Sequence, residues 1–180
     1  MQIISGKFRG RKLALPPNAR PTQNRARVAL FNMIGPMIEN HAAVWDAFAG
    51  SGAFGIEFLS RGWAKRAIFT DADAGAINAV RKNLAGFDAG QFTLLRADAL
   101  SAVKEFATQA DIVFVDPPFA SPELGEKFIA EFSRHAKPGA IIIWEMENTA
   151  HSQNPTAFSG VEVLKDKTYG RARFLIMKKI

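Results

Sequence analysis

Along most of the chain, short apolar runs alternate with longer stretches in which apolar residues recur every three or four positions. The short runs predict β-strands over residues 44–48, 67–71, 92–96, 111–115 and 140–145. The helical spacing between them predicts helices over residues 52–61, 74–85, 100–107 and 122–135. Strands and helices that alternate in this way form a mainly parallel sheet with helices on both faces. Two further runs, 161–167 and 172–179, predict a closing hairpin around Tyr169-Gly170.

The first 40 residues follow a different pattern. Residues 2–5 and 11–15 are partly apolar and flank Gly6-Lys7-Phe8-Arg9-Gly10, which predicts a hairpin with a basic tip. After Pro16-Pro17, apolar positions predict a helix over about residues 24–39, with Thr22 as its cap and Gly35-Pro36 as a kink or an early end. We therefore divide the chain into an N-terminal extension, residues 1–40, and an α/β domain, residues 41–180.

Composition narrows the class of protein. The chain has 180 residues, enough for one domain with a small appendage, and it contains no cysteine. This composition excludes a disulfide scaffold, a cysteine-ligated metal site and thiol catalysis, and it fits the reducing cytoplasm. No apolar run approaches the ~18 residues that a membrane span needs, and the basic N-terminus lacks the apolar stretch of a secretory signal. We expect a cytoplasmic protein without a membrane partner.

The charge is concentrated at the N-terminus. Residues 1–38 carry seven basic and no acidic side chains, whereas the rest of the chain holds 16 basic and 17 acidic ones. The basic residues of this segment are Lys7, Arg9, Arg11, Lys12, Arg20, Arg25 and Arg27. A basic arm on a near-neutral body is typical of a nucleic-acid contact, and a solubilising tail is the alternative.

In a parallel α/β sheet, ligands bind at the carboxyl ends of the strands. The first predicted strand leads into Asp46-Ala47-Phe48-Ala49-Gly50-Ser51-Gly52-Ala53-Phe54-Gly55, whose glycines match G-x-G-x-x-G. Glycines at a strand-to-helix turn let an adenosine or a phosphate approach the backbone. A tight turn without a ligand is the alternative interpretation.

Three acidic residues refine this candidate cofactor site. Asp71 follows Gly50 by 21 residues, the spacing of a carboxylate that accepts hydrogen bonds from ribose hydroxyls. Asp46 lies where a dinucleotide would place its pyrophosphate, so it favours a cationic ligand such as S-adenosylmethionine over NAD. Asp98 follows the third strand and could accept from an adenine amino group. Helix capping is the alternative for both Asp46 and Asp98.

The fourth strand ends in Asp116-Pro117-Pro118-Phe119, the most informative tetrapeptide of the chain. The exocyclic amine of a base is a poor nucleophile because its lone pair is delocalised. Acceptors around its N–H bonds, such as the Asp116 carboxylate and the Pro117 carbonyl, can direct the lone pair toward a methyl group. Phe119 offers a stacking face for the base. A strand that simply ends in a proline turn is the alternative. No histidine spacing indicates a metal site, and we expect none.

These residues together resemble the bacterial 16S ribosomal RNA (guanine-N2)-methyltransferases that modify one guanine in the head of the small subunit. The resemblance rests on Ile3 to Leu13, Arg20-Pro21-Thr22, Arg25, Arg27, Leu30-Phe31-Asn32, the Asp46 to Gly52 turn, Leu59 to Gly62, Asn83-Leu84 and Asp116 to Phe119. Asn24, Val28 and Trp63 depart from the pattern.

The resemblance implies a Rossmann-like class I methyltransferase fold with a seven-stranded sheet and an antiparallel last strand. It also implies S-adenosylmethionine as methyl donor and the assembled small subunit as substrate. We expect Asp116, Pro117 and Phe119 to hold the target base and a monomer to carry out the reaction. The expected cofactor residues are Asp46, Phe48, Gly50, Ser51, Gly52, Gly55, Asp71, Asp98 and Asp116, and the seven basic residues of the extension are expected to contact RNA.

Three alternatives remain open at this point. A DNA adenine-N6 methyltransferase could use the same tetrapeptide, although 180 residues leave little room for sequence readout. A non-catalytic RNA-binding or assembly factor could retain the fold, and an NAD-dependent oxidoreductase could share the glycine turn.

Overall fold

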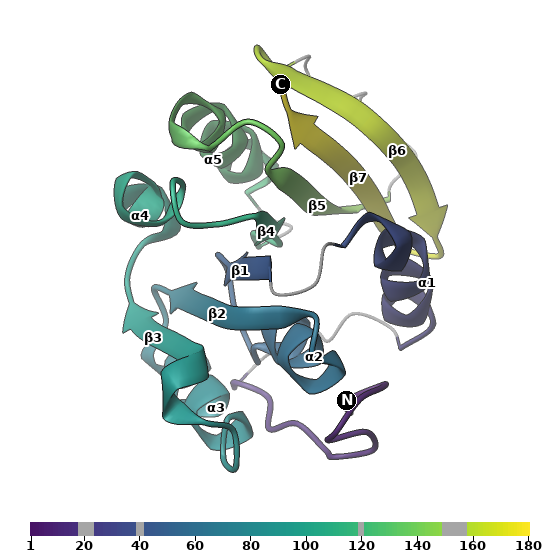
Figure 1. Ribbon diagram of the computed structural model, residues 1–180, viewed down its shortest axis with the longest axis vertical. Helices are drawn as coiled ribbons and strands as arrows, with labels where there is room; N and C mark the ends of the chain where they lie inside the picture. The colour runs from purple at the N-terminus through teal and green to yellow at the C-terminus, as the bar shows by residue number, and fades with distance from the viewer. Residues whose placement is uncertain (18–23, 39–41, 119–120, 149–157) are drawn as a thin grey trace.

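The computed structural model describes residues 1–17, 24–38, 42–118, 121–148 and 158–180. Its centre is one seven-stranded sheet of order β3-β2-β1-β4-β5-β7-β6 (Figure 1). The strands are β1 (Ala42–Asp46), β2 (Ala64–Asp71), β3 (Phe92–Arg96), β4 (Ile112–Val115), β5 (Ile141–Glu147), β6 (Val161–Tyr169) and β7 (Ala172–Lys179). The first five strands pair in parallel, and β7 is antiparallel to both of its neighbours. The predicted α/β fold class, with its antiparallel last strand, is confirmed.

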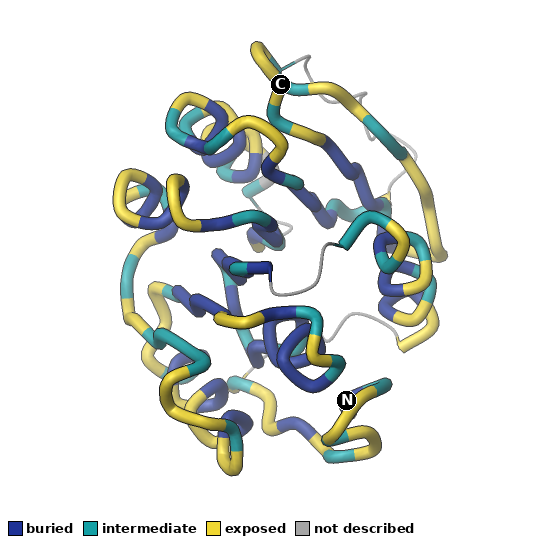
Figure 2. The backbone as a smooth tube through the Cα atoms, viewed as in Figure 1, coloured by how far each residue is buried: buried dark blue, intermediate teal, exposed yellow. Residues whose placement is uncertain are grey.

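Helices cover both faces of the sheet (Figure 1). They are α1 (Asn24–Ile34), α2 (Ala53–Arg61), α3 (Ala74–Asn83), α4 (Ala99–Phe106) and α5 (Pro122–His135), with short 3₁₀ turns η1 (Gly35–Met37) and η2 (Ala89–Gln91). Side chains of α1, α2 and α3 share one apolar core with one face of the sheet, and α4 and α5 share a second core with the other. Strands β1 and β4, near the middle of the sheet, are almost wholly buried between these two layers, whereas β6 at its edge is largely exposed (Figure 2).

The predicted elements match the structure closely where apolar periodicity is strong. The α5 bounds agree with the prediction, whereas β2 begins three residues before its predicted start. Helix α1 ends at Ile34, and a 3₁₀ turn with Pro36 near its start follows. Proline lacks the N–H that would continue the α-helical bonding, so Gly35-Pro36 ends this helix and does not merely kink it.

The basic hairpin forms a compact loop with little strand character. Its two limbs pair through one antiparallel bridge, Gln2 with Lys12, and Gly6 and Gly10 both have positive φ angles of 83°. The loop packs against the end of α2, where the Ser60 carbonyl accepts the Lys7 N–H at 2.7 Å. A Cβ at Gly6 would lie 1.9 Å from that carbonyl oxygen, so only glycine allows the approach.

The N-terminal segment is therefore anchored in the fold. Ile3 and Leu13 are buried in the same core as α1, α2 and the sheet. Asn83 of α3 binds the backbone of Ala14 twice, accepting its N–H at 2.7 Å and donating to its carbonyl at 2.9 Å. Removal of this segment would expose apolar surface of the α/β domain as well as basic charge.

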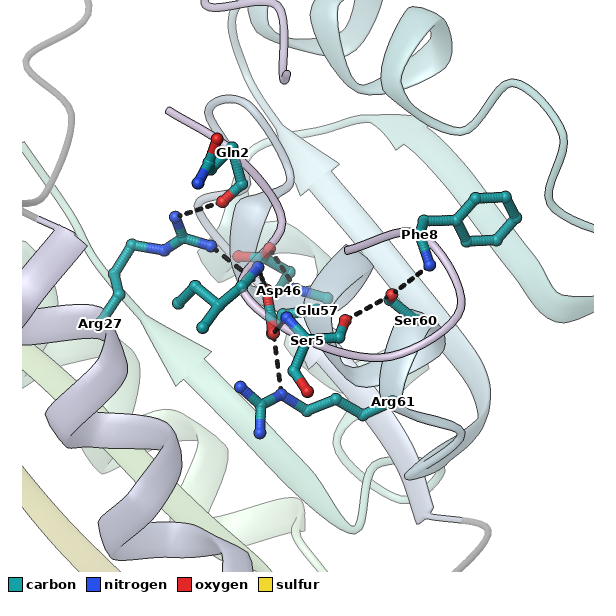
Figure 3. Close-up of polar contacts among 10 residues, drawn as sticks. Gln2, Ser5, Phe8, Arg27, Asp46, Glu57, Ser60 and Arg61 are labelled. Atoms are coloured by element: carbon teal, nitrogen blue, oxygen red, sulfur yellow. Dashed lines mark hydrogen bonds and ion pairs between the residues drawn. The ribbon is translucent and has the colours of Figure 1, made fainter. Parts of the chain in front are cut away.

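Glu57 of α2 joins three parts of the chain (Figure 3). Its side chain is fully buried, and its carboxylate accepts the N–H groups of Ile4 at 2.8 Å and Ser5 at 2.9 Å. Arg61 donates to it at 2.8 Å, and the Arg27 guanidinium of α1 lies 3.6 Å away. A buried carboxylate needs such partners because its desolvation is unfavourable.

We predict that Glu57→Gln lowers the free energy of unfolding by about 3–5 kcal/mol, since it leaves the Arg27 guanidinium buried without its nearest charge partner. Urea denaturation followed by circular dichroism measures this change. Glu162→Gln, at an exposed position on β6, is the control and should change stability by about 0.5 kcal/mol or less. A loss of similar size in both variants would refute the role given to Glu57.

Candidate active site at the carboxyl ends of β1, β4 and β5

A pocket opens where the strand order reverses between β1 and β4. The parallel registers pair Asp46 with Phe114 and Val115 with Trp144. Because side chains alternate along a strand, Asp46, Asp116 and Glu145 point to the same face of the sheet as α1 and α2. The pocket is lined by Met1, Leu15, Pro16, Arg27, Leu30, Phe31, Asp46, Phe48, Ala49, Gly50, Ser51, Ala53, Phe54, Phe114, Asp116 and Glu145.

Asp46 is only 1% exposed, and its carboxylate accepts the Gly55 N–H of the first turn of α2 at 3.1 Å. Burial raises its pKa to about 7; the nearby Asp71 adds to this rise, and the Gly55 N–H and Arg27 oppose it. The hydrogen bond to Gly55 is the kind of helix-capping contact that the alternative interpretation of Asp46 predicts. A carboxylate with this raised pKa would gain from a cation in the pocket.

Asp116 and Glu145 form an acidic pair on adjacent strand ends. Burial, Glu145 and Asp46 together raise the pKa of Asp116 well above its usual value. Glu145 is 3% exposed, and the sequence analysis missed it. The signal was available, because β5 is a parallel strand of the same sheet and its end also belongs to the ligand-binding edge.

The glycines of the turn have two different roles. Gly50 has a φ of +53°, and no atom would lie within 4 Å of a Cβ placed there, so this position has room for a ligand. A Cβ at Gly55 would instead lie 2.4 Å from Phe69 of β2, so this glycine allows α2 to pack on the sheet. Gly52 begins α2 with a positive φ, and Ser51 and Phe48 line the pocket.

The remaining predicted cofactor acids lie outside the pocket lining. Asp71 accepts the N–H groups of Gly50 and Asp73, both at 2.9 Å, so it fixes the glycine turn. Asp98 is exposed and caps α4 by accepting the Ser101 N–H, as the helix-capping alternative predicts. Their contacts to ribose and adenine stay predictions. Phe119 falls outside the described residues, and Pro117 is buried at the end of β4.

Most of the described basic residues of the extension lie at the surface, and one of them is buried. Lys7, Arg9, Lys12 and Arg25 are exposed, and Arg11 stacks on Phe8 with its guanidinium carbon 4.0 Å from the ring centre. Arg20 falls outside the described residues.

Arg27 corrects the prediction that all these residues reach RNA. It is 5% exposed and lines the acidic pocket, so it cannot contact a phosphate on the surface. The sequence carried a signal for this burial, because Arg27 occupies the helical stripe of Leu30, Phe31 and Ile34.

Comparison with known proteins identifies the family. Residues 1–178 match the protein family described as Conserved hypothetical protein 95. The chain belongs to this family. Ribosomal RNA small subunit methyltransferase D of Escherichia coli strain K12 is 35% identical over 182 residues, which cover 99% of this chain and 90% of that protein. Putative rRNA methyltransferase YlbH of Bacillus subtilis strain 168 is 33% identical over 187 residues, 99% of each chain.

Similar solved structures are also described as methyltransferases. The structure described as putative methyltransferase yhhF from Escherichia coli has a TM-score of 0.83 and 35% identity, covering 99% of this chain and 97% of that one. Putative methylase HI0767 from Haemophilus influenzae has a TM-score of 0.77 and 32% identity, covering 99% and 98%. This family member is a methyltransferase of Rossmann-like fold, and its cofactor is S-adenosylmethionine.

The residues of the pocket fit this cofactor. Gly50 leaves open space at the turn, and the acids at the ends of β1, β4 and β5 suit its cationic sulfonium and ammonium groups. The acids thus disfavour NAD, whose pyrophosphate is anionic, and the oxidoreductase alternative is set aside. Within the described residues, no group of three or more His, Cys, Asp or Glu side chains is arranged so that it could hold a metal ion. The helices that the structure describes include none long and apolar enough to span a bilayer.

We predict that the affinity for S-adenosylmethionine falls below pH 7, because the cofactor's ammonium requires ionised Asp46, and the raised pKa protonates this acid as the pH falls. The groups facing Asp46 are the Gly55 N–H, Arg27, Asp71 and Asp116. Isothermal titration calorimetry from pH 5 to 9 measures this affinity. Well below pH 7, the affinity should fall by up to about tenfold per pH unit for each carboxyl proton that must be released on binding.

A second loss is expected above about pH 8, where the cofactor's own α-amino group loses its proton. Asp46→Asn keeps the Gly55 hydrogen bond but cannot titrate, so it should bind weakly at neutral pH and with a flatter acid limb. An affinity of the unaltered protein that is constant from pH 5 to 7 would contradict this assignment.

Proposed function

We propose that this protein transfers the methyl group of S-adenosylmethionine to the exocyclic N2 of a guanine in 16S rRNA, in the assembled small ribosomal subunit. The relatives named above as a small-subunit rRNA methyltransferase and a putative rRNA methyltransferase support an rRNA substrate. The observation that carries the proposal is Asp116, which lies at the end of β4, lines the acidic pocket and is followed by Pro117.

The chemistry needs positioning more than covalent help. The cofactor supplies an electrophilic methyl group on a positively charged sulfur. Asp116 and the Pro117 carbonyl accept hydrogen bonds from the two N–H groups of the guanine amine and direct its lone pair along the line of attack. With the cofactor bound, the new nitrogen–carbon bond would replace the carbon–sulfur bond, and the electron pair of the broken bond would stay on the sulfur. Asp116, with its raised pKa, can then take up the proton that the methylated nitrogen releases.

The base must leave its stack to reach this pocket. In the proposal Phe119 supplies the stacking face for the flipped guanine. Asp71 and Asp98 hold the adenosine end of the cofactor, and Asp46 faces the cationic end. The protein acts as a monomer in the cytoplasm.

The RNA backbone is held by the exposed basic residues of the N-terminal extension. Lys7, Arg9 and Lys12 project from a loop that is fixed to α2 and to the segment that follows α3. A cationic surface attached rigidly to the catalytic domain sets the orientation of the RNA as well as its affinity. Arg11, Arg20 and Arg25 complete the proposed set.

We predict that Asp116→Ala lowers the rate of methyl transfer about 100-fold or more, by analogy with the loss of one preorganised polar group. Tritium transfer to small subunits that lack the modification measures the rate, and mass spectrometry of digested rRNA identifies the product. Glu123→Ala, at an exposed position on α5, is the control and should keep the full rate. Near-normal turnover by Asp116→Ala would refute the role of this acid.

The same assay with free 16S rRNA, small subunits and double-stranded DNA tests the substrate. N2-methylguanosine formed in subunits supports the proposal, whereas N6-methyladenine in DNA would favour the adenine methyltransferase. Binding to RNA without methylation of any of these substrates would favour an assembly factor.

We also predict that the triple reversal Lys7→Glu, Arg9→Glu and Lys12→Glu weakens binding to the subunit while cofactor affinity stays near normal. The slope of log affinity against log salt should flatten by up to about 2 to 3, or 0.7–0.9 for each lost phosphate contact. Filter binding at several salt concentrations measures it. Reversal of Lys104, Lys127 and Lys178, exposed on α4, α5 and β7, is the matched control. An equal effect of both triple variants would argue against a specific RNA surface.

A further inference from the structure

The Arg27 side chain has a hydrogen-bonding group that its protein neighbours do not satisfy. Arg27 reaches from α1 toward the N-terminal segment, and its Nη1 donates to the Gln2 carbonyl at 3.1 Å (Figure 3). Its Nη2 is buried and makes no hydrogen bond, and the Oε2 atom of Glu57 lies 3.6 Å from it. A buried N–H without an acceptor is unfavourable, so such a group calls for an explanation.

Glu57 does not account for this arginine. Its carboxylate already accepts two backbone N–H groups and the Arg61 Nε, all within 2.9 Å. The longer Arg27 contact leaves the guanidinium free to bind a further acceptor. Burial lowers the pKa of Arg27, but an arginine stays charged at neutral pH.

The pocket that Arg27 lines has two electrical sides. Asp46, Asp116 and Glu145 come from the sheet, and Arg27, from α1, is the one cationic side chain among the described residues that line it. A ligand that carries one carboxylate and one ammonium on the same carbon matches this arrangement, since each of its charges meets the opposite sign. The methionine end of S-adenosylmethionine is such a group.

We propose that Arg27 binds the carboxylate of the cofactor's amino-acid end, while the acids of β1, β4 and β5 face its ammonium. This assignment gives the unsatisfied Nη2 an acceptor and replaces the RNA contact predicted for this residue. The guanidinium holds a planar fork of donors, which suits a carboxylate. The inference rests on the cofactor and not on the identity of the RNA target.

The test compares two ligands that differ in one group. Decarboxylated S-adenosylmethionine keeps the adenosine, the sulfonium and the ammonium and lacks only the carboxylate. Calorimetry without RNA should show that the unaltered protein binds S-adenosylmethionine about 10- to 100-fold more tightly than the decarboxylated ligand, the range for a hydrogen bond to a charged group. Equal affinities would overturn the proposal without any variant.

Variants then assign the preference to Arg27. Arg27→Met should bind S-adenosylmethionine about as weakly as the decarboxylated ligand, and its affinity for the decarboxylated ligand should change little. A purely structural role predicts that both affinities fall by the same factor, which would also overturn the proposal. Arg81→Met, exposed on α3, should keep the full preference.

Folding and function are controlled separately. The melting temperature reports folding, and where Arg27→Met does not fold, Arg27→Lys replaces it, since a lysine keeps the charge but loses the fork. Arg27→Lys should show a reduced preference for the carboxylate, and an unreduced preference overturns the proposal. Because no RNA is present, these results do not depend on whether guanine N2 is the methylated atom.

Discussion

The buried carboxylate of Glu57 is the constraint on which the shape of the pocket depends. It holds the N-terminal segment through the N–H groups of Ile4 and Ser5, and it meets arginines from both α1 and α2. Met1, Leu15 and Arg27, which line the pocket, belong to the elements that this carboxylate joins. The extension is thus part of the wall of the active site, and its basic loop is placed relative to that site by the same contacts.

The fold could be predicted because its signals are local. Apolar runs and glycine or proline breaks lie within a few residues of the strands and helices that they define, and the predicted α5 shows how far this holds. The acids at the ends of β1 and β4 followed from a rule about parallel sheets. The antiparallel last strand was expected from the resemblance, whereas the strand order was not predicted, because periodicity does not say which strands are neighbours.

The errors concern side chains whose environment is made by distant segments. Arg27 carries the charge of an RNA-binding residue, yet it is buried. It lies on the apolar stripe of α1 and close to the carboxylate of Glu57, 30 positions later in the sequence. Glu145 lies near the end of β5, which leads to an antiparallel hairpin and not to a further β–α unit, so the β–α pattern did not point to it. The distribution of charge along a chain does not distinguish an exposed cation from a buried one. The apolar periodicity of a helix does, because it shows which of its faces is buried.

On the proposed function, the separation of charge also explains how a base can be selected from a polyanion. The exposed cations of the basic loop attract phosphates, whereas the carboxylates of Asp46, Asp116 and Glu145 disfavour any anion inside the pocket. A neutral base can enter the pocket but its phosphates cannot, so the backbone stays with the loop while the base is flipped. Burial is the main cause of the raised pKa values of Asp46 and Asp116, and repulsion from neighbouring acids adds to it. A cationic cofactor relieves that repulsion, and it would leave Asp116 ionised to accept the N–H groups of the incoming amine.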